Sequence, residues 1–179
     1  MPHRVDSFEA VVLPHMRAGY NLARWLLRND HDAEDVTQEA IVRAFRFFDG
    51  FSGENPRAWL LTVVRNSAYT FLQQNRAREL SSEFDEVLHS ELASNGRTSE
   101  TPEVLVLRSA QQRFLNEAVE ALPVEFREVF VLREMEGLSY KEIADVARIP
   151  IGTVMSRLSR ARRQLQATVA CREQAGSAS

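Results

Sequence analysis

Residues 137–165 constrain the fold of this chain most strongly, because they must form two short helices that meet at a tight turn. Ser139, followed three residues later by Glu142, is the capping-box pattern of a helix N-terminus. The helix cannot continue through Ile149-Pro150, since proline lacks a backbone N–H and disfavours the helical conformation of the residue before it. We expect the second helix to begin at Thr153. The pattern predicts a helix-turn-helix.

The second helix of this motif has an apolar stripe and a basic face. Four apolar residues recur at helical spacing and predict its buried side: Val154, Leu158, Ala161 and Leu165. Residues 152–172 contain no acid and five arginines: Arg157, Arg160, Arg162, Arg163 and Arg172. A bundle helix with solvated arginines has the same pattern. The capped first helix, the Ile-Pro turn and the absence of acids together favour a helix that enters the major groove of DNA.

Charge is unevenly distributed along the chain. The 179 residues carry a net charge of −3, which argues against a wholly basic nucleic-acid binder. Residues 80–107 hold six acidic side chains and one basic one, whereas the flanking segments are close to neutral. Because the acidic segment also contains Ser, Asn, Gly and Pro, it is expected to be a flexible linker between two folded parts.

Cysteine content and hydropathy exclude several classes of protein. Cys171 is the only cysteine, so neither an internal disulfide nor a zinc site built on cysteine spacing is possible. The N-terminus lacks the apolar run of a signal peptide, and no apolar stretch reaches the roughly 18 residues of a membrane span. We expect a cytoplasmic protein without membrane insertion.

The first part of the chain has the periodicity of a helical bundle. Over 6–28 apolar residues recur every three or four positions, and Pro14 should kink this segment or split it. Asp32 is the predicted N-cap of a strong helix whose outward strip includes Asp35, Gln38 and Glu39. Asp35 and Glu39 would suit a divalent metal only opposite a second acidic helix, and no such helix is predicted. A solvated face and a partner-docking face remain as interpretations.

A loop over 49–56, rich in Gly, Asn and Pro, precedes a helix over about 57–78. The outward face of this helix carries Trp59 and Asn66, and Arg76 and Arg78 follow near its end. A tryptophan beside a flexible loop and arginines suits single-stranded DNA, whose bases stack on aromatic rings. The alternative, which periodicity alone favours, is that Trp59 packs against the preceding helix.

Two further helices are predicted over 108–121 and 124–136, with Gly137 as a C-cap. The expected fold is all-α, with two small helical domains over 1–79 and 108–172. The acidic linker 80–107 joins them, and a disordered tail over 173–179 follows. No catalytic residue, metal site or cofactor is expected.

The chain resembles the sigma-70 family of RNA polymerase sigma factors, in particular the extracytoplasmic-function (ECF) group, which keeps regions 2 and 4. The resemblance covers about 8–78 and 111–167. In the first part it rests on DAEDVTQEA (32–40) and AWLLTVVRN (58–66). In the second it rests on ALPVEFREVFVLREMEGLSYKEIA (121–144) and IPIGTVMSRLSRAR (149–162). The order of the two parts and the acidic linker match as well.

This resemblance implies a subunit that binds core RNA polymerase and directs promoter-specific transcription initiation. Asp35, Gln38 and Glu39 would dock on the β′ clamp helices. Eight residues would accept the −10 element with a flipped base: Phe51, Ser52, Gly53, Asn55, Trp59, Asn66, Arg76 and Arg78. Eight others would bind the −35 element: Thr153, Met155, Ser156, Arg157, Ser159, Arg160, Arg162 and Arg163.

The implied partners are core RNA polymerase, through its β′ clamp and β flap, promoter DNA, and an anti-sigma factor that clamps both domains. The linker would run toward the RNA exit path. Near the −10 residues this chain has neutral Thr70, Gln73 and Gln74 where many relatives carry charges, so its −10 helix is less basic than usual.

Two other functions remain possible from the residues. A free-standing helix-turn-helix regulator would bind duplex DNA as a dimer, but it gives no role to the loop and Trp59, and no heptad for a dimer seam is present. An all-α metal-dependent hydrolase would use Asp35 and Glu39 as metal ligands, but this sequence does not predict the second acidic helix that such a site needs.

Overall fold

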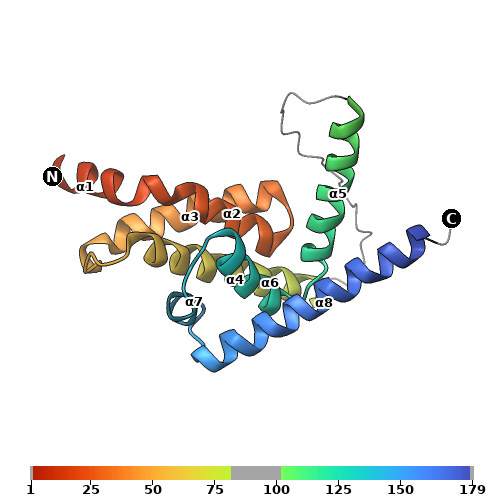
Figure 1. Cartoon of the computed structure of the whole chain (residues 1–179). Helices are drawn as coiled ribbons and strands as arrows, with labels where there is room; N and C mark the ends of the chain where they lie inside the picture. The colour runs from red at the N-terminus through yellow and green to blue at the C-terminus, as the bar shows by residue number, and fades with distance from the viewer. Residues whose placement is uncertain (1, 82–101, 178–179) are drawn as a thin grey trace.

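The computed structural model describes residues 2–81 and 102–177, with side-chain environments over 7–81 and 110–175. Every regular element in these ranges is helical, which confirms the all-α class. The helices form an N-terminal bundle over 2–81 and a C-terminal bundle over 102–177 (Figure 1). The central part of the predicted linker, 82–101, lies outside the described residues.

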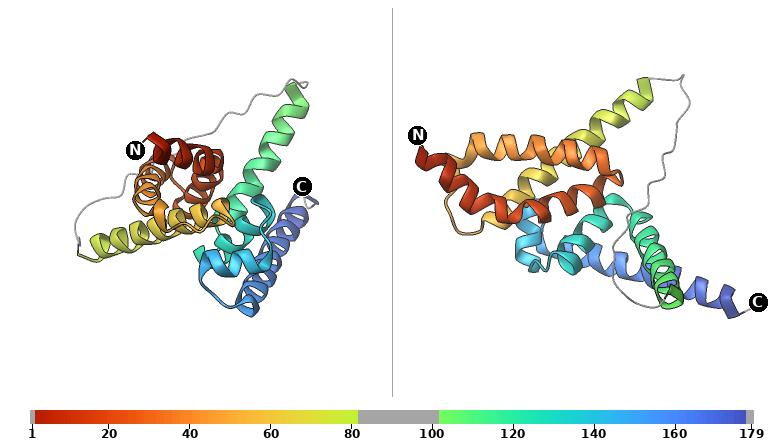
Figure 2. Two further views of the ribbon diagram at one scale, coloured as in Figure 1. Left: turned by 90° about the vertical axis from the view of Figure 1, so that its left-hand side faces the viewer. Right: turned by 90° about the horizontal axis from the view of Figure 1, so that it is seen from above.

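The N-terminal bundle contains α1 (Pro2–Val12), α2 (Met16–Leu27), α3 (Asp30–Phe47) and α4 (Pro56–Ser81). A 3-10 turn over Leu13–His15 separates α1 from α2, so Pro14 splits the first helical segment as predicted. Helices α2, α3 and α4 pack against one another (Figure 2). Their buried apolar residues are Leu22, Ala23, Leu26, Ala33, Val36, Ala40, Ala44, Leu60, Leu61, Val64 and Ala68.

Helix α3 begins earlier than the sequence predicted. Asn29 is its N-cap, and the Asn29 Oδ1 accepts a hydrogen bond of 2.9 Å from the backbone N–H of Asp32. Asp32 lies in the first turn, where its charge is favoured by the helix dipole. The prediction of Asp32 as the cap was wrong, because Asn and Asp are about equally good caps and the pattern does not choose between them.

The C-terminal bundle contains α5 (Pro102–Glu120), α6 (Val124–Phe130), a π-helical turn η3 (Val131–Met135), α7 (Tyr140–Ala147) and α8 (Ile151–Ser177). Helices α4 and α5 both extend into the segment 80–107 that was predicted to be linker. Helix α8 continues to Ser177, so residues 173–177 are helical where a disordered tail was predicted.

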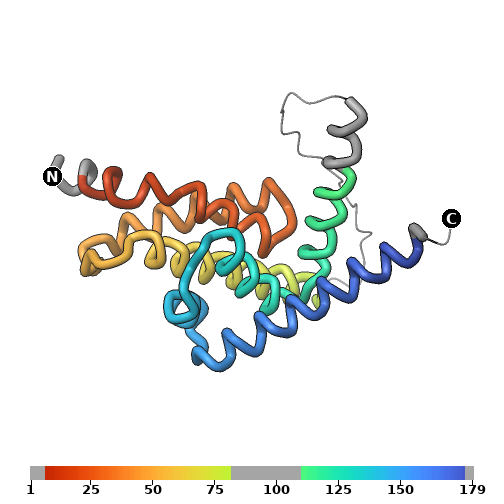
Figure 3. Tube along the Cα trace, in the orientation of Figure 1, coloured from red at the N-terminus to blue at the C-terminus, as the bar shows by residue number. Residues whose placement is uncertain are grey.

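Helices α7 and α8 form the predicted helix-turn-helix (Figure 3). The capping box is present: the Ser139 Oγ accepts from the Glu142 N–H at 3.2 Å, and the Glu142 Oε2 accepts from the Ser139 N–H at 2.7 Å. Helix α8 begins at Ile151, directly after Pro150, whose carbonyl accepts from the N–H of Thr153 at 2.9 Å. The predicted start at Thr153 was therefore two residues late.

The two bundles lie against each other. Helix α4 packs on α7, and α2 packs on α6. One cluster of buried apolar residues extends through both bundles, from Leu22 and Leu61 to Leu132 and Ile143. No helix in the described part of the chain is long and apolar enough to cross a lipid bilayer.

Candidate nucleic-acid interfaces

The first candidate interface is the outward face of α8. Val154, Leu158 and Ala161 are fully buried, as predicted from their spacing, and they fix which face of α8 points outward. Because they hold one side of the helix in the core, the opposite side is exposed at Met155, Ser156, Ser159, Arg160 and Arg163. Thr153 and Arg157 are half-buried at the edges of this face.

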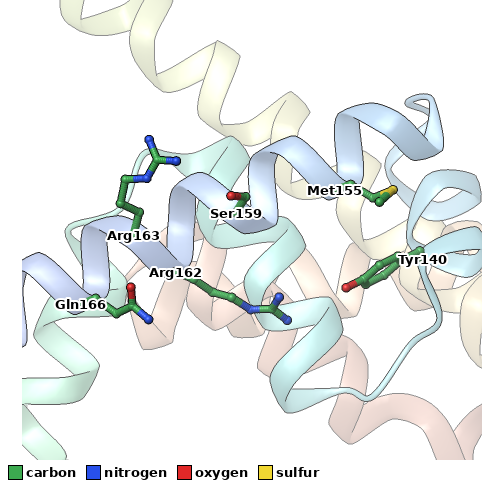
Figure 4. Close-up of a pocket in the computed structure, with 6 residues that line it drawn as sticks. All are labelled: Tyr140, Met155, Ser159, Arg162, Arg163 and Gln166. Atoms are coloured by element: carbon green, nitrogen blue, oxygen red, sulfur yellow. The ribbon is translucent and has the colours of Figure 1, made fainter.

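A shallow hollow of about 330 Å³ runs along this face of the helix-turn-helix. It is lined by Tyr140, Met155, Ser159, Arg162, Arg163 and Gln166 (Figure 4). Met155, at 53% exposure, provides an apolar surface beside hydroxyl, amide and guanidinium donors. This mixture suits a base edge together with a thymine methyl group.

Arg162 of α8 has an acidic partner. Its Nη2 lies 2.6 Å from Oε1 of Glu134 in η3, and the two side chains are 45% and 41% exposed. The hydrogen bonds from Arg162 to Glu134 and Tyr140 raise the pKa of the guanidinium. An exposed pair of this kind contributes little to stability, so Arg162 can exchange Glu134 for a phosphate at small cost.

The second candidate interface is the loop before α4. Phe48, Phe51 and Trp59 form an aromatic cluster: the ring centroids of Phe51 and Trp59 lie 5.0 Å apart, and those of Phe48 and Phe51 lie 6.1 Å apart and stacked. Trp59 is half-buried, and its ring packs against Phe51 in the loop and against Phe48 in the 3-10 turn Phe48–Gly50 that follows α3. Ser52 and Gly53 are exposed at the tip, where Gly53 has a φ of +90°.

Asn55 connects this loop to the helix-turn-helix. Its Oδ1 caps α4 by accepting from the N–H of Ala58 at 3.0 Å, and its Nδ2 donates to Oε1 of Glu142 at 2.8 Å. Asn66 is half-buried further along α4, and Arg76 and Arg78 are exposed near its end. The predicted −10 residues therefore lie along one loop and one helix, and the predicted −35 residues lie on a separate helix.

The third candidate surface is the outward strip of α3. Asp35, Gln38 and Glu39 are all exposed. Gln38 also lines an apolar groove of about 540 Å³ between α2 and α3, and Met16, Tyr20, Ile41 and Val42 line the apolar part of this groove. The sequence placed Val42 on the outward strip but gave no sign of Met16 and Tyr20, because a groove between two helices depends on how the helices pack.

A buried polar cluster between the bundles was missed by the sequence. The Glu128 carboxylate has no exposed surface; its Oε1 accepts from Nε of Arg65 at 2.6 Å and its Oε2 from the Tyr69 hydroxyl at 2.9 Å. Burial and the Glu128 charge raise the pKa of Tyr69. Burial alone would lower the pKa of Arg65, but the bond to Glu128 outweighs it and the pKa is raised.

Arg127, beside Glu128, is also buried. Its Nη1 donates to the carbonyls of Glu120 and Leu122, and its Nη2 donates to the carbonyl of Leu26 at 3.3 Å. Burial and the nearby charge of Arg28 lower the pKa of Arg127 to about 10. The sequence signal for this cluster was two charged residues within the apolar run 126–132, which the helical period alone did not explain.

Comparison with known proteins agrees with the two-bundle arrangement. Residues 11–78 match the family model for sigma-70 region 2, and residues 115–165 match that for sigma-70, region 4. The chain is 37% identical over 134 residues to the ECF RNA polymerase sigma-E factor of Escherichia coli. The aligned residues cover 73% of this chain and 70% of that protein. It is 32% identical over 148 residues to the ECF RNA polymerase sigma-E factor of Haemophilus influenzae, with coverages of 81% and 77%.

Two solved structures are similar over most of the chain. The sigma factor RpoE in complex with the anti-sigma factor NepR, from Bartonella quintana, has a TM-score of 0.72 and 28% identity and covers 92% of this chain and 97% of its own. CnrH in complex with the cytosolic domain of CnrY has a TM-score of 0.63 and 25% identity, with coverages of 93% and 89%. The chain belongs to the sigma-70 family: it is an ECF-type RNA polymerase sigma factor that directs transcription initiation, and it is not an enzyme.

Proposed function

We propose that the two bundles divide promoter recognition between them. Helix α8 binds the −35 element in the major groove, and the 51–55 loop with α4 accepts the −10 strand. The strip on α3 docks on the β′ clamp of core RNA polymerase, and the C-terminal bundle contacts the β flap. The two domains then follow the bundles over 2–81 and 102–177, close to the predicted bounds 1–79 and 108–172, and the linker lies between them.

The exposed face of α8 is the observation that carries this proposal. Met155, Ser156, Ser159 and Arg160 project from a helix whose other side is held in the core. A recognition helix needs short donors and an arginine within reach of base edges, on a rigid support. Arg157, Arg162 and Arg163, with Thr153 in the first turn of α8, would contact phosphates on either side.

The loop and α4 supply what a flipped base requires. Ser52, Gly53 and Asn55 offer backbone and amide hydrogen-bonding groups, while the rings of Phe51 and Trp59 offer an apolar surface for stacking. Asn66 lies further along α4, and Arg76 and Arg78 provide positive charge for phosphates. Unstacking a base from the duplex costs on the order of a few kcal/mol. The stacking and hydrogen bonds gained in the pocket offset this cost.

The strip on α3 suits a helical partner. Gln38 lines the apolar groove between α2 and α3 together with the charged residues Arg17 and Glu34, and Val42 in that groove is 51% exposed. Asp35 and Glu39 are exposed on the same helix next to Glu34 and Gln38. A groove with an apolar floor and charged edges binds an amphipathic helix, because the floor buries its apolar face and the edges pair with its charges. The clamp helices of core polymerase are the partner we assign to it.

The regulation and the cellular location of this protein are proposed from its similarity to known sigma factors. The two structural neighbours named above are each bound to a partner, an anti-sigma factor in the case of RpoE. We propose that an anti-sigma factor also restrains this protein and that it acts in the cytoplasm, where core polymerase and DNA are found.

The experiment is run-off transcription with core polymerase on a pooled promoter library, with and without this protein. New start sites that share two spaced sequence elements are the expected result. If no new starts appear while the purified protein alone still shifts duplex DNA, the free-standing helix-turn-helix regulator is the better description.

A further inference from the structure

Two large apolar side chains lie exposed on the first two turns of α8. Ile151 is 45% exposed, and Met155, four residues later, is 53% exposed. Residues four apart on a helix lie on the same face, so Ile151 and Met155 form one apolar strip. Contact between this strip and water is unfavourable, and a partner that covers the strip gains free energy.

The helix-turn-helix holds this apolar strip outward. Val154, next to Met155 in the chain, is fully buried and fixes the side of α8 that faces the core. The carbonyl of Pro150 accepts hydrogen bonds from the N–H groups of Thr153 at 2.9 Å and Val154 at 3.1 Å. These bonds close the first turn of α8, which carries Ile151. The strip is therefore preformed, and little backbone entropy is lost when a partner covers it.

The residues beside the strip favour DNA as the partner. Residues 152–172 contain no acid, and Arg160 and Arg163 are exposed on the same helix. Met155 also lines the hollow with Ser159 and Arg163, so hydroxyl and guanidinium donors lie near its side chain (Figure 4). An apolar face of another protein would cover the strip but leave these cations unpaired, whereas a DNA duplex supplies phosphates for them.

The chemistry of the strip selects among the four bases. Thymine alone presents an apolar group in the major groove, its C5-methyl, while the other three bases present hydrogen-bond donors and acceptors there. Ile151 has no side-chain hydrogen-bonding group, and Met155 has only a weakly accepting sulfur. Against a G·C pair the strip would leave polar base edges unpaired, which costs free energy. The strip therefore matches T·A pairs.

The spacing along α8 orders the contacts. Ile151 and Met155 are separated by about 6 Å of helix rise, since each residue adds roughly 1.5 Å. Base pairs are stacked about 3.4 Å apart, so the two side chains reach neighbouring or next-but-one pairs. Arg160 lies about 7.5 Å beyond Met155, and its guanidinium suits a guanine on the far side of the second thymine. Along α8, the strip and Arg160 together predict two T·A pairs followed by a G·C pair.

We propose that Ile151 and Met155 determine part of the promoter specificity by reading the C5-methyl groups of two thymines in the −35 element. The inference rests on the proposed binding of α8 to that element. It adds Ile151 to the candidate −35 residues, and it gives Met155 a defined ligand, a methyl group in the major groove.

The test removes single methyl groups from the DNA. The pooled promoter selection first supplies the −35 sequence that the parent chain uses. Each thymine of that element is then replaced singly by deoxyuridine, which lacks the C5-methyl and keeps the same base pair. A competition assay measures the affinity of each duplex for holoenzyme made from core polymerase and the full-length chain.

The protein variants shorten the strip or preserve it. Ile151→Ala and Met155→Ala shorten it, and Met155→Leu keeps an apolar side chain of similar size. Leu13→Ala is the matched control, because Leu13 is an apolar residue that is 40% exposed in the turn between α1 and α2. All three positions are exposed, so the substitutions leave the core intact, and circular dichroism with thermal unfolding verifies that each variant is folded.

The parent should bind about fourfold more weakly when uracil replaces either of the two thymines, which is the effect of losing one buried methyl-sized group. Met155→Ala should lose this sensitivity at one of the thymines only, and Ile151→Ala at the other. Each alanine variant should bind the uracil duplex for its own position nearly as tightly as the parent does, because that contact is already lost. Met155→Leu and Leu13→Ala should keep both effects.

Equal affinity of the parent for thymine and uracil duplexes at every position would overturn the inference. It is also overturned if Met155→Ala weakens both duplexes equally, since Met155 then contacts another group, such as a protein partner. A selected −35 element without T·A pairs contradicts only this inference, because the selection itself then supports promoter recognition. No new start sites at all would contradict the proposed function as well.

Discussion

The Nε atom of Arg65 lies 2.6 Å from Oε1 of Glu128, and this pair joins the two halves of the molecule. Arg65 comes from α4 and Glu128 from α6, 63 residues further along the chain. The Tyr69 hydroxyl donates to the other oxygen of the same carboxylate, and the Arg65 guanidinium lies 4.1 Å from the centroid of the Tyr69 ring. The three side chains form one unit that exists only while the bundles are in contact.

Removing one charged member of this unit should lower the free energy of unfolding more than removing both charges together. Glu128→Leu leaves the Arg65 guanidinium without its partner, and we expect the free energy of unfolding to fall by about 3 kcal/mol. The double change Glu128→Leu/Arg65→Met should recover most of that loss, because no unpaired charge remains. Denaturant unfolding of the four proteins of this cycle measures the coupling. Additive effects of the two single changes would show that the pair does not act as a unit.

Tyr69 should make stability depend on pH in the alkaline range. Its pKa is raised in the folded protein by burial and by the Glu128 charge, so the unfolded chain loses this proton first as the pH rises. The stability it contributes is complete below the ordinary tyrosine pKa near 10 and is lost progressively above it. Tyr69→Phe should be less stable at neutral pH and should lose less stability between about pH 9 and 11. If the free energy of unfolding changes with pH in the same way in the parent and in Tyr69→Phe, Tyr69 does not have this role.

The capping box of α7 should stabilise the helix-turn-helix measurably. Ser139→Ala removes the side-chain acceptor for the Glu142 N–H, and we expect a loss of about 1 kcal/mol in the free energy of unfolding. The backbone N–H and the hydroxyl of Ser139 lower the pKa of Glu142, so this stabilisation is present at neutral pH and declines as the pH falls below about 4.5. Urea unfolding of the parent and of Ser139→Ala, at neutral pH and below about pH 4.5, measures this stabilisation. Thr168→Ala, which removes an exposed hydroxyl further along α8, is the control.

Reversing a charge on α3 should affect polymerase binding and leave DNA contacts alone. Glu39→Arg places a cation beside the groove between α2 and α3 and breaks the 2.5 Å pair with Arg43. We expect the affinity for core polymerase to fall at least tenfold, since an acidic side chain of the assigned docking surface is replaced by a cation. Glu9→Arg, an exposed reversal on α1, should bind as the parent does. Unchanged affinity in Glu39→Arg would remove α3 from the docking surface.

The sequence predicted the elements well because local patterns determine them. The Ser139–Glu142 box, the break at Pro14 and the stripe Val154–Leu158–Ala161 all follow from capping, proline geometry and helical spacing. The errors at Asp32 and Thr153 concern helix ends, where neighbouring residues are nearly equivalent as caps. The family resemblance, now supported by matches to both regions, pointed to the function.

The contact between the bundles was not predictable from these patterns. Glu128 stands within an apolar run, but its burial depends on Arg65 and Tyr69, which are distant along the chain. Asn55 was assigned to DNA from the resemblance, but nothing local indicates its bond to Glu142. Such contacts arise from how complete helices dock, which a single sequence does not encode as a pattern.

The division of recognition between the bundles is the central claim, and one measurement tests it directly. The pooled promoter selection is repeated with Arg160→Ala, with Arg172→Ala, whose guanidinium lies over the Phe114 ring, as the control. We expect a loss of about 1–3 kcal/mol in preference at the upstream element and no change at the downstream element. A changed downstream element, or an unchanged upstream one, would contradict the assignment of α8 to the −35 element.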